Sequence, residues 1–166
     1  MRWNLYRTVV LTVSDRSARG VREDKSGPEA VRMLQEAGYQ VVQTGILPDE
    51  EELLAEELKR ICDQHLADLI LTTGGTGFSM RDRTPEATLA VAHRQAPGIS
   101  EAIRAYSLSI TPRAMLSRGV SVIREQTLII NLPGSPKAVR ENLEAVLPTL
   151  DHGLAILTGR AGECAR

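Results

Sequence analysis

Cysteine is scarce in this sequence, and the two that occur, Cys62 and Cys164, lie far apart. Their spacing fits neither a metal site nor a redox pair, and two cysteines hardly make a disulfide scaffold in 166 residues. His65, His93 and His152 show no spacing typical of a zinc site or a catalytic triad. We therefore expect Cys62 in the core, Cys164 in the tail, and the histidines in surface or core roles.

Long apolar runs and an excess of one sign of charge are also absent. No run approaches the roughly 20 apolar residues that cross a bilayer, and the first eight residues do not resemble a signal peptide. Acidic and basic residues nearly cancel, leaving a net charge of −1 at pH 7. This balance excludes a general footprint for nucleic acid or a membrane surface. We expect a cytoplasmic protein that binds neither.

The length of the chain suits one domain. A chain of 166 residues with 42% hydrophobic residues can bury about 70% of the surface that its unfolded form exposes. The last residues, TGRAGECAR, combine glycine and charge without an apolar pattern. We expect a single domain over residues 1–158 and a flexible tail over residues 159–166.

Four short apolar runs rich in β-branched residues predict β-strands at residues 8–13, 40–47, 69–73 and 127–132. Three of them lack strict alternation, which is typical of parallel strands covered on both faces. A shorter run at residues 119–125 is a candidate for a further strand or an edge strand.

Helical periodicity appears between these runs. The capping signature Ser26-x-x-Glu29 predicts the start of a helix that ends before Gly38. A second signature, Asp49-x-x-Glu52, predicts a helix with one apolar stripe. That stripe consists of Leu54, Leu58, Ile61 and Cys62.

Further helices are predicted to begin at Thr84-Pro85, near Gly98, around Pro112 and at Ser135-Pro136. Pro148 is expected to bend or end the last of them. The alternation of strands and helices predicts an α/β fold, a three-layer α/β/α domain with a mostly parallel central sheet.

Ligands bind outside the carboxyl ends of the strands in such a sheet. The segments that follow the four main strands are SDRSARG from Ser14, GILPDE from Gly45, TTGGTG from Thr72 and NLPGSPK from Asn131. We expect these four loops to line a single edge of the sheet.

The TTGGTG segment has the residue types of a phosphate-binding loop. Its glycines permit positive φ and a close approach of backbone N–H groups to an anion, and Thr76 can donate a hydroxyl. No Gly-Lys-Ser/Thr follows, which excludes a Walker A loop, and Met80 occupies the place of the third glycine in the dinucleotide fingerprint. A glycine-rich turn without a ligand is the alternative.

The NLPGSPK segment adds Gly134 and a helix start at Ser135, whose N-terminal amides can also hold an anion. Alone, this segment is most often a capped turn. Two such loops after parallel strands favour a ligand that carries phosphate.

Three aspartates lie near these loops. Asp49 is placed to cap a helix, Asp15 is placed to cap a turn, and Asp82 lies between two arginines with which it could form exposed ion pairs. The functional alternative is that one or two of them hold Mg²⁺, which prefers oxygen ligands shared between carboxylate and phosphate. The residues alone leave both alternatives open.

Taken in order, SDR, PDE, TTGGTG followed by RDRTPEAT, LSR and NLPGSPK resemble the MogA group of molybdopterin adenylyltransferases. MoaB-type proteins and the G domains of gephyrin and its plant counterpart are relatives of this group. The resemblance extends from about Tyr6 to Leu150. The complete TPEAT box is similar to the adenylyltransferase branch rather than to the MoaB branch.

The resemblance implies transfer of AMP from Mg-ATP to the phosphate of molybdopterin, with release of pyrophosphate. It assigns catalysis and the Mg²⁺ ion to Asp49 and Asp82. It implies substrate and nucleotide binding at Ser14, Asp15, Thr73, Gly74, Gly75, Thr76, Gly77, Thr84, Pro85, Asn131, Pro133, Gly134 and Ser135.

The resemblance also implies a homotrimer, with a molybdenum-inserting enzyme as a further partner. Between Gly98 and Gly119, five apolar residues could face a partner or the core: Ile99, Ile103, Leu108, Met115 and Leu116. Two other functions remain open. One is a non-catalytic molybdopterin-binding or scaffold protein of the MoaB type, and the other is a nucleotide hydrolase, which the missing P-loop lysine disfavours.

Overall fold

Six strands form one sheet in the order β2-β1-β3-β6-β5-β4 in the computed structural model, which describes residues 6–161. β1 pairs in parallel with β2 and β3, and β3 pairs in parallel with β6, whereas β5 is antiparallel to β6 and β4. The strands are β1 (Arg7–Val13), β2 (Gln40–Leu47), β3 (Leu69–Thr73), β4 (Arg94–Gln95), β5 (Ser121–Arg124) and β6 (Thr127–Leu132). The predicted mostly parallel sheet is confirmed.

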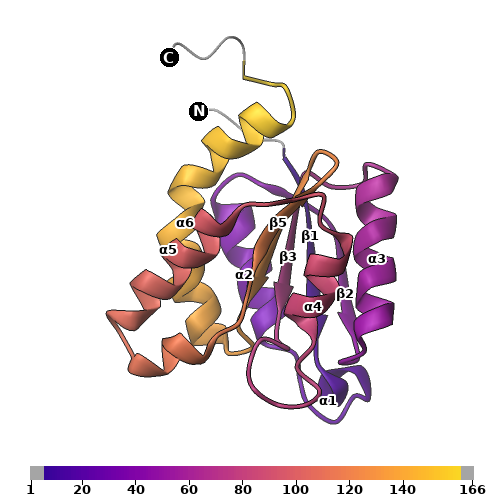
Figure 1. Cartoon of the computed structure of the whole chain (residues 1–166), viewed down its shortest axis with the longest axis vertical. Helices are drawn as coiled ribbons and strands as arrows, with labels where there is room; N and C mark the ends of the chain where they lie inside the picture. The colour runs from indigo at the N-terminus through magenta and orange to yellow at the C-terminus, as the bar shows by residue number, and fades with distance from the viewer. Residues whose placement is uncertain (1–5, 162–166) are drawn as a thin grey trace.

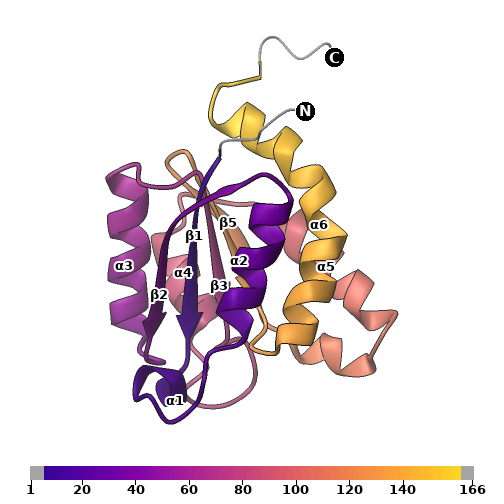
Figure 2. The same ribbon diagram turned by 180° about the vertical axis from the view of Figure 1, so that it is seen from behind.

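Helices cover both faces of this sheet (Figures 1 and 2). They are α1 (Asp15–Ala18), α2 (Ser26–Glu36), α3 (Glu51–Asp63), α4 (Thr84–Val91), α5 (Pro97–Leu108), the 3-10 helix η1 (Pro112–Leu116) and α6 (Pro136–Leu157). One apolar core joins the sheet to α2, α5 and α6, and a second joins the other face to α3 and α4. The three-layer prediction is therefore confirmed.

The central strands are buried because helices cover both of their faces. Every residue of β3 and β6 is buried, and so is every residue of β1 after Arg7. Along β1, Val10 packs into the core of α2 and α6, whereas Val9 and Leu11 pack into the core of α3 and α4. Strand β2, at the edge, has no buried residue.

Two predictions of helix capping are wrong. Ser26 is the first residue of α2, and its hydroxyl contacts Thr73 Oγ1 at 3.0 Å, while Asp24 Oδ1 accepts from the amide of Gly27 at 3.1 Å. At α3 the cap position is Glu50, and no side chain caps that helix end. In both places the predicted capping side chain is held by partners elsewhere in the fold.

The last helix also differs from its prediction. α6 continues through Pro148 over 22 residues, so the proline does not end it. Val139, Leu143 and Leu150 of α6 are buried against the sheet and α2. This packing stabilises the helix across the hydrogen bond that proline cannot donate.

The remaining outcomes concern shorter features. The run at residues 119–125 forms β5, while β4, only two residues long, was not predicted. Cys62 is buried, as expected, whereas Cys164 and most of the predicted tail lie outside the described residues. Among residues 6–161, no helix combines the length and hydropathy of a membrane span.

The course of the chain creates a crevice between β1 and β3. From β1 the chain crosses to β2 through α2, and it then returns to β3 through α3, which packs on the other face. The connections therefore diverge at the carboxyl ends of these two adjacent strands. In open α/β sheets, this is the place where ligands bind.

Candidate functional site

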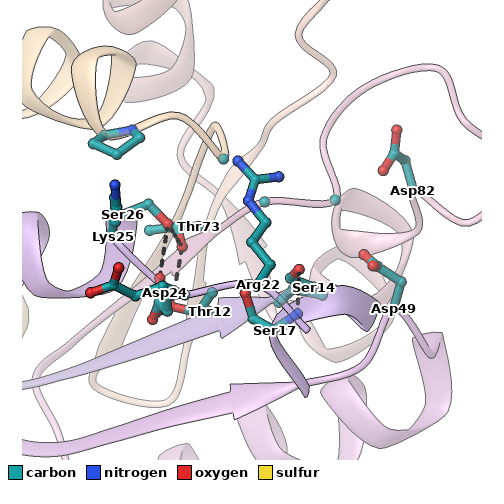
Figure 3. Close-up of a pocket in the computed structure, with 16 residues that line it drawn as sticks. Thr12, Ser14, Ser17, Arg22, Asp24, Lys25, Ser26, Asp49, Thr73 and Asp82 are labelled. Atoms are coloured by element: carbon teal, nitrogen blue, oxygen red, sulfur yellow. Dashed lines mark hydrogen bonds between the residues drawn. The ribbon is translucent and has the colours of Figure 1, made fainter. Parts of the chain in front are cut away.

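A cavity of about 490 Å³ opens at the carboxyl ends of β1 and β3 (Figure 3). Its wall includes residues that follow β1, β2, β3 and β6, which confirms that the four predicted loops meet at one edge. The predicted site residues that line it are Ser14, Asp49, Thr73, Gly74, Gly75, Asp82 and Gly134.

Two glycines of the TTGGTG segment occupy backbone conformations that favour glycine. Gly74 has a φ of 93° and Gly75 a φ of 69°. A Cβ atom on Gly74 would overlap the carbonyl oxygen of Val13, and one on Gly75 would overlap Thr84 Oγ1. The bare backbone is therefore needed to bring this loop against the end of β1 and the start of α4.

Asp15 and Asp49 tie two of the loops together. Asp49 Oδ2 accepts from the amide of Asp15 at 2.9 Å, and Asp15 Oδ1 accepts from the amide of Asp49 at 3.0 Å. The guanidinium of Arg81 donates to both carboxylate oxygens of Asp15, at 3.0 and 2.9 Å. This pairing lowers the pKa of Asp15, which holds the loops after β1 and β2 together and does not line the cavity.

Asp49 and Asp82 form the acidic end of the cavity (Figure 3). Burial raises the pKa of Asp49, and the negative charges of Asp15 and Asp82 add to the increase. Asp82 Oδ2 accepts from the amide of Ser79 at 2.9 Å. The two negative charges therefore repel each other in a partly buried space, and a cation between them would relieve this repulsion.

The flanking arginines do not neutralise Asp82. Arg81 pairs with Asp15 at 2.9 Å, and Arg83 pairs with Glu51 at 2.8 Å. The alternative of an exposed ion-pair cluster around Asp82 is therefore wrong. Its carboxylate faces the cavity instead.

The donor set at this end fits Mg²⁺ shared with a phosphate. Asp49 and Asp82 supply hard oxygen ligands at this end of the cavity. The hydroxyl of Thr84, next to Gly75, does not line the cavity and is buried with no hydrogen-bond partner in the described part of the chain. Within residues 6–161, no three His, Cys, Asp or Glu side chains group as a metal site. Mg²⁺ is characteristically held by one or two carboxylates and completes its shell with phosphate and water.

Arg118 fastens the loop that carries Asp82. Its guanidinium donates to the carbonyls of Gly77 at 2.9 Å and Asp82 at 2.7 Å, and to the carboxylate of Glu86 at 2.6 Å. Its own amide donates to the carbonyl of Thr76 at 2.9 Å. One side chain thus fixes both ends of residues 77–82, a role that sequence reasoning missed although Arg118 ends the LSR motif.

One known protein family matches most of the chain. A family model described as "Probable molybdopterin binding domain" matches residues 9–152. The chain belongs to this family. The resemblance expected from the motifs is therefore confirmed.

Relatives in this molybdopterin-binding family match most of the chain. The molybdopterin adenylyltransferase of Haemophilus influenzae is 47% identical over 139 residues, covering 82% of this chain and 71% of the relative. That of Escherichia coli is 45% identical over 145 residues, covering 86% and 74%. The structure of MoaB, a molybdopterin biosynthesis enzyme from Thermus thermophilus, has a TM-score of 0.89 at 46% identity and covers 93% of this chain and 98% of its own.

Several predicted site residues of this family member lie away from the main cavity. Thr76, Gly77 and Pro133 line a neighbouring cavity of about 290 Å³, whose wall also includes Ile103 and Leu116. The TTGGTG segment thus borders two cavities, with Gly74 and Gly75 facing one and Thr76 and Gly77 the other.

The remaining predicted site residues make contacts within the protein and do not line the main cavity. The Asn131 amide donates to the hydroxyls of Thr72 and Thr88, both at 3.0 Å. Ser135 caps α6 by accepting from the amide of Ala138 at 3.0 Å. Thr84 and Pro85 are buried at the start of α4. A ligand contact for any of them stays a prediction.

Sequence reasoning also missed the loop that joins α1 to α2. Arg22, Asp24, Lys25 and Ser26 all line the cavity. The available signal was their position shortly after a predicted strand end, but a run of mixed charge such as Arg-Glu-Asp-Lys is equally typical of a solvated surface loop.

Proposed function

We propose that the protein is a molybdopterin adenylyltransferase, which transfers AMP from Mg-ATP to the phosphate of molybdopterin and releases pyrophosphate during molybdenum cofactor biosynthesis. The observation that carries the proposal is one cavity where Asp49 and Asp82 face the positive-φ glycines Gly74 and Gly75. Relatives at 45–47% identity bear the name of this activity.

The reaction needs no nucleophilic side chain. An oxygen of the molybdopterin phosphate forms a bond to the α-phosphorus of ATP, and the bond from that phosphorus to the β-phosphate bridging oxygen breaks. The electron pair leaves with pyrophosphate. Alignment of the two phosphates and neutralisation of their charge are therefore the main catalytic tasks.

The two sides of the cavity suit these tasks. Asp49 and Asp82 would hold Mg²⁺, which when bound offsets the negative charge of the phosphates. The backbone at Gly74 and Gly75 carries no side chain that would block the approach of a phosphate. Arg118 keeps the glycine segment and Asp82 in a fixed relation, because it binds carbonyls on both sides of the intervening loop.

Pyrophosphate release tests the proposal. Wild-type protein with Mg-ATP should release pyrophosphate only when molybdopterin is present, and Asp49→Ala and Asp82→Ala should both abolish most of this release. An unchanged rate in both variants would contradict the assignment of the two acids.

A non-catalytic molybdopterin-binding protein is the second candidate, because the family model that matches the chain is described by binding rather than by catalysis. Binding of molybdopterin without any pyrophosphate release in wild-type protein would favour that alternative.

We also propose a homotrimer that works in the cytoplasm and delivers its product to a molybdenum-inserting enzyme. Of the apolar residues expected to face a partner or the core, Ile103 is buried, whereas Leu108, Met115 and Leu116 are exposed on α5 and η1. Tyr106 and Ile110 are exposed in the same segment. Light scattering after gel filtration should give three times the mass of one chain, and a monomer would contradict this proposal.

A further inference from the structure

The cavity has a basic end that the proposed chemistry has not used. Arg22 and Lys25, in the loop between α1 and α2, are the cationic side chains among the described residues that line it. Figure 3 shows Asp24 and Lys25 on one side of the cavity and Asp49 and Asp82 on the other, with Arg22 between them. The loop between α1 and α2 thus brings two cations and two acids, Glu23 and Asp24, to the side of the cavity away from Asp49 and Asp82.

These two cations have no partner of their own. Within residues 6–161, neither Arg22 nor Lys25 takes part in an ion pair or a side-chain hydrogen bond. Most arginines near the cavity are paired, as Arg81 is with Asp15 and Arg118 with Glu86. Two unpaired cations facing one cavity are a suitable arrangement for an anionic ligand.

Asp24 lies between the two cations in sequence, but its carboxylate is committed to the protein. Asp24 Oδ2 accepts from the Thr12 hydroxyl at 2.7 Å, and Oδ1 accepts from the amide of Gly27 at 3.1 Å. A Cβ on Gly27 would lie 2.6 Å from both Asp24 Oδ2 and Thr12 Oγ1, so glycine is required for this close packing. Asp24 therefore anchors the loop to the end of β1.

A network of hydroxyls strengthens the anchor. Ser26 Oγ lies 3.0 Å from Thr73 Oγ1, which in turn donates to Thr12 Oγ1 at 3.4 Å. The loop that presents Arg22 and Lys25 is thereby joined to the ends of both β1 and β3. Glu23 and Asp24 also line the cavity, and their negative charges offset part of the charge of the two cations.

We propose that Arg22 and Lys25 form a phosphate-binding subsite, across the cavity from Asp49 and Asp82. This inference rests on the proposed function, which brings two phosphate-bearing substrates into one cavity. A phosphate whose charge is offset by metal suits the acidic end, whereas a phosphate without metal requires cationic side chains. The occupant is either the distal phosphates of the nucleotide or the phosphomonoester of the pterin.

The test is the affinity for inorganic pyrophosphate without Mg²⁺, measured by calorimetry on the full chain. The double variant Arg22→Gln/Lys25→Gln should bind pyrophosphate roughly 10- to 100-fold more weakly than wild type, because two charge-assisted contacts are lost. The matched control is Arg19→Gln/Lys59→Gln, which removes the same charge at positions that do not line the cavity, and it should bind as wild type does.

Steady-state kinetics then identify the occupant. A higher KM for ATP alone in the double variant assigns the subsite to the nucleotide, and a higher KM for molybdopterin alone assigns it to the pterin phosphate. Pyrophosphate binding that is absent in wild type, or equal in wild type and the double variant, would overturn the subsite. Failure of the proposed function looks different, because wild type would then bind pyrophosphate at this subsite without transferring AMP.

Discussion

The two ends of the central sheet use similar polar residues in opposite ways. At the amino ends of the strands, Asp68 Oδ2 accepts from the amide of Arg7 at 2.9 Å, and Arg7 and Arg160 both pair with its carboxylate. Tyr39 donates to Asp151 at 2.6 Å in the same part of the molecule. These polar groups satisfy one another.

At the carboxyl ends, several polar groups remain unpaired within the described residues, although Arg81 pairs with Asp15 there. Asp49 and Asp82 form no ion pair there, Arg22 and Lys25 have no partner, and the hydroxyl of Thr84 is buried without a hydrogen bond. Unpaired polar groups lower the stability of a fold. We therefore expect a ligand to bind at the end of the sheet where such groups gather. Substitutions at the amino end should therefore affect folding, and those at the carboxyl end should affect turnover.

The largest effect is expected at the acidic end of the cavity. Asp82→Ala should lower kcat for adenylyl transfer by about 100-fold or more, because a preorganised charge is lost where phosphate charge develops. Its Tm should stay close to that of wild type, since Asp82 accepts one hydrogen bond from a loop amide. Glu52→Ala, an exposed position on α3, is the control and should leave both quantities unchanged.

Asp68 provides the opposite result at the amino end. Asp68→Ala should lower the free energy of unfolding by about 1 kcal/mol, because the part-buried amide of Arg7 loses its acceptor. Urea denaturation measures this loss, and kcat at 25 °C should be within about twofold of wild type. A large fall in kcat of Asp68→Ala with an unchanged free energy of unfolding would contradict the distinction between the amino and carboxyl ends of the sheet.

Arg118 should show a mixed effect, since it is a positioning residue that holds the loop of Asp82. Arg118→Gln should lower kcat by about tenfold and raise the Mg²⁺ concentration needed for half-maximal activity. Arg118→Lys should recover little, because a lysine cannot reach three acceptors in fork geometry. Arg83→Gln, which removes an exposed pair with Glu51, should leave the Mg²⁺ dependence unchanged.

The smallest effect concerns pH and stability at Asp49. Because its pKa is higher in the folded chain than the ordinary value of 3.8, ionised Asp49 destabilises the fold above its folded pKa, and this cost is absent well below 3.8. Asp49→Asn should therefore raise the Tm at pH 7 by about 1 °C and leave it unchanged near pH 3.

Asp15→Asn is the control of opposite sign. Arg81 lowers the pKa of Asp15, so this carboxylate stabilises the fold above pH 3.8 and loses that contribution as the pH falls through its folded pKa. The Tm of Asp15→Asn should therefore fall at pH 7. Shifts of the same sign in both variants would contradict this account of the two acids.

The sequence was informative where local pattern and structure coincide. β-branched runs predicted β1, β2, β3 and β6 within one residue. β1, β3 and β6 are covered on both faces, and such strands are rich in apolar side chains. The glycine loop was equally predictable, since positive φ and close backbone approach both require glycine.

The sequence predictions were wrong or incomplete where a side chain bonds to a residue distant in sequence instead of a neighbouring one. Ser26 and Asp49 have the residue types of helix caps, yet their oxygens bond to Thr73 and to the amide of Asp15 instead. The role of Arg118 depends on carbonyls 41 and 36 residues away in sequence. No local pattern predicts such contacts, and a strand of two residues such as β4 carries no pattern at all.

Two contacts that hold the glycine segment join parts of the chain that are far apart in sequence. A chain that extends from β1 through Asp82 contains the glycines and both aspartates. It lacks the Arg118 guanidinium, which donates to the Gly77 carbonyl, and the Leu132 carbonyl, which accepts from the amide of Gly74. Those partners come from the last third of the sequence, so each contact closes a long loop of the chain. A nascent chain that ends before Arg118 therefore lacks both contacts to the glycine segment.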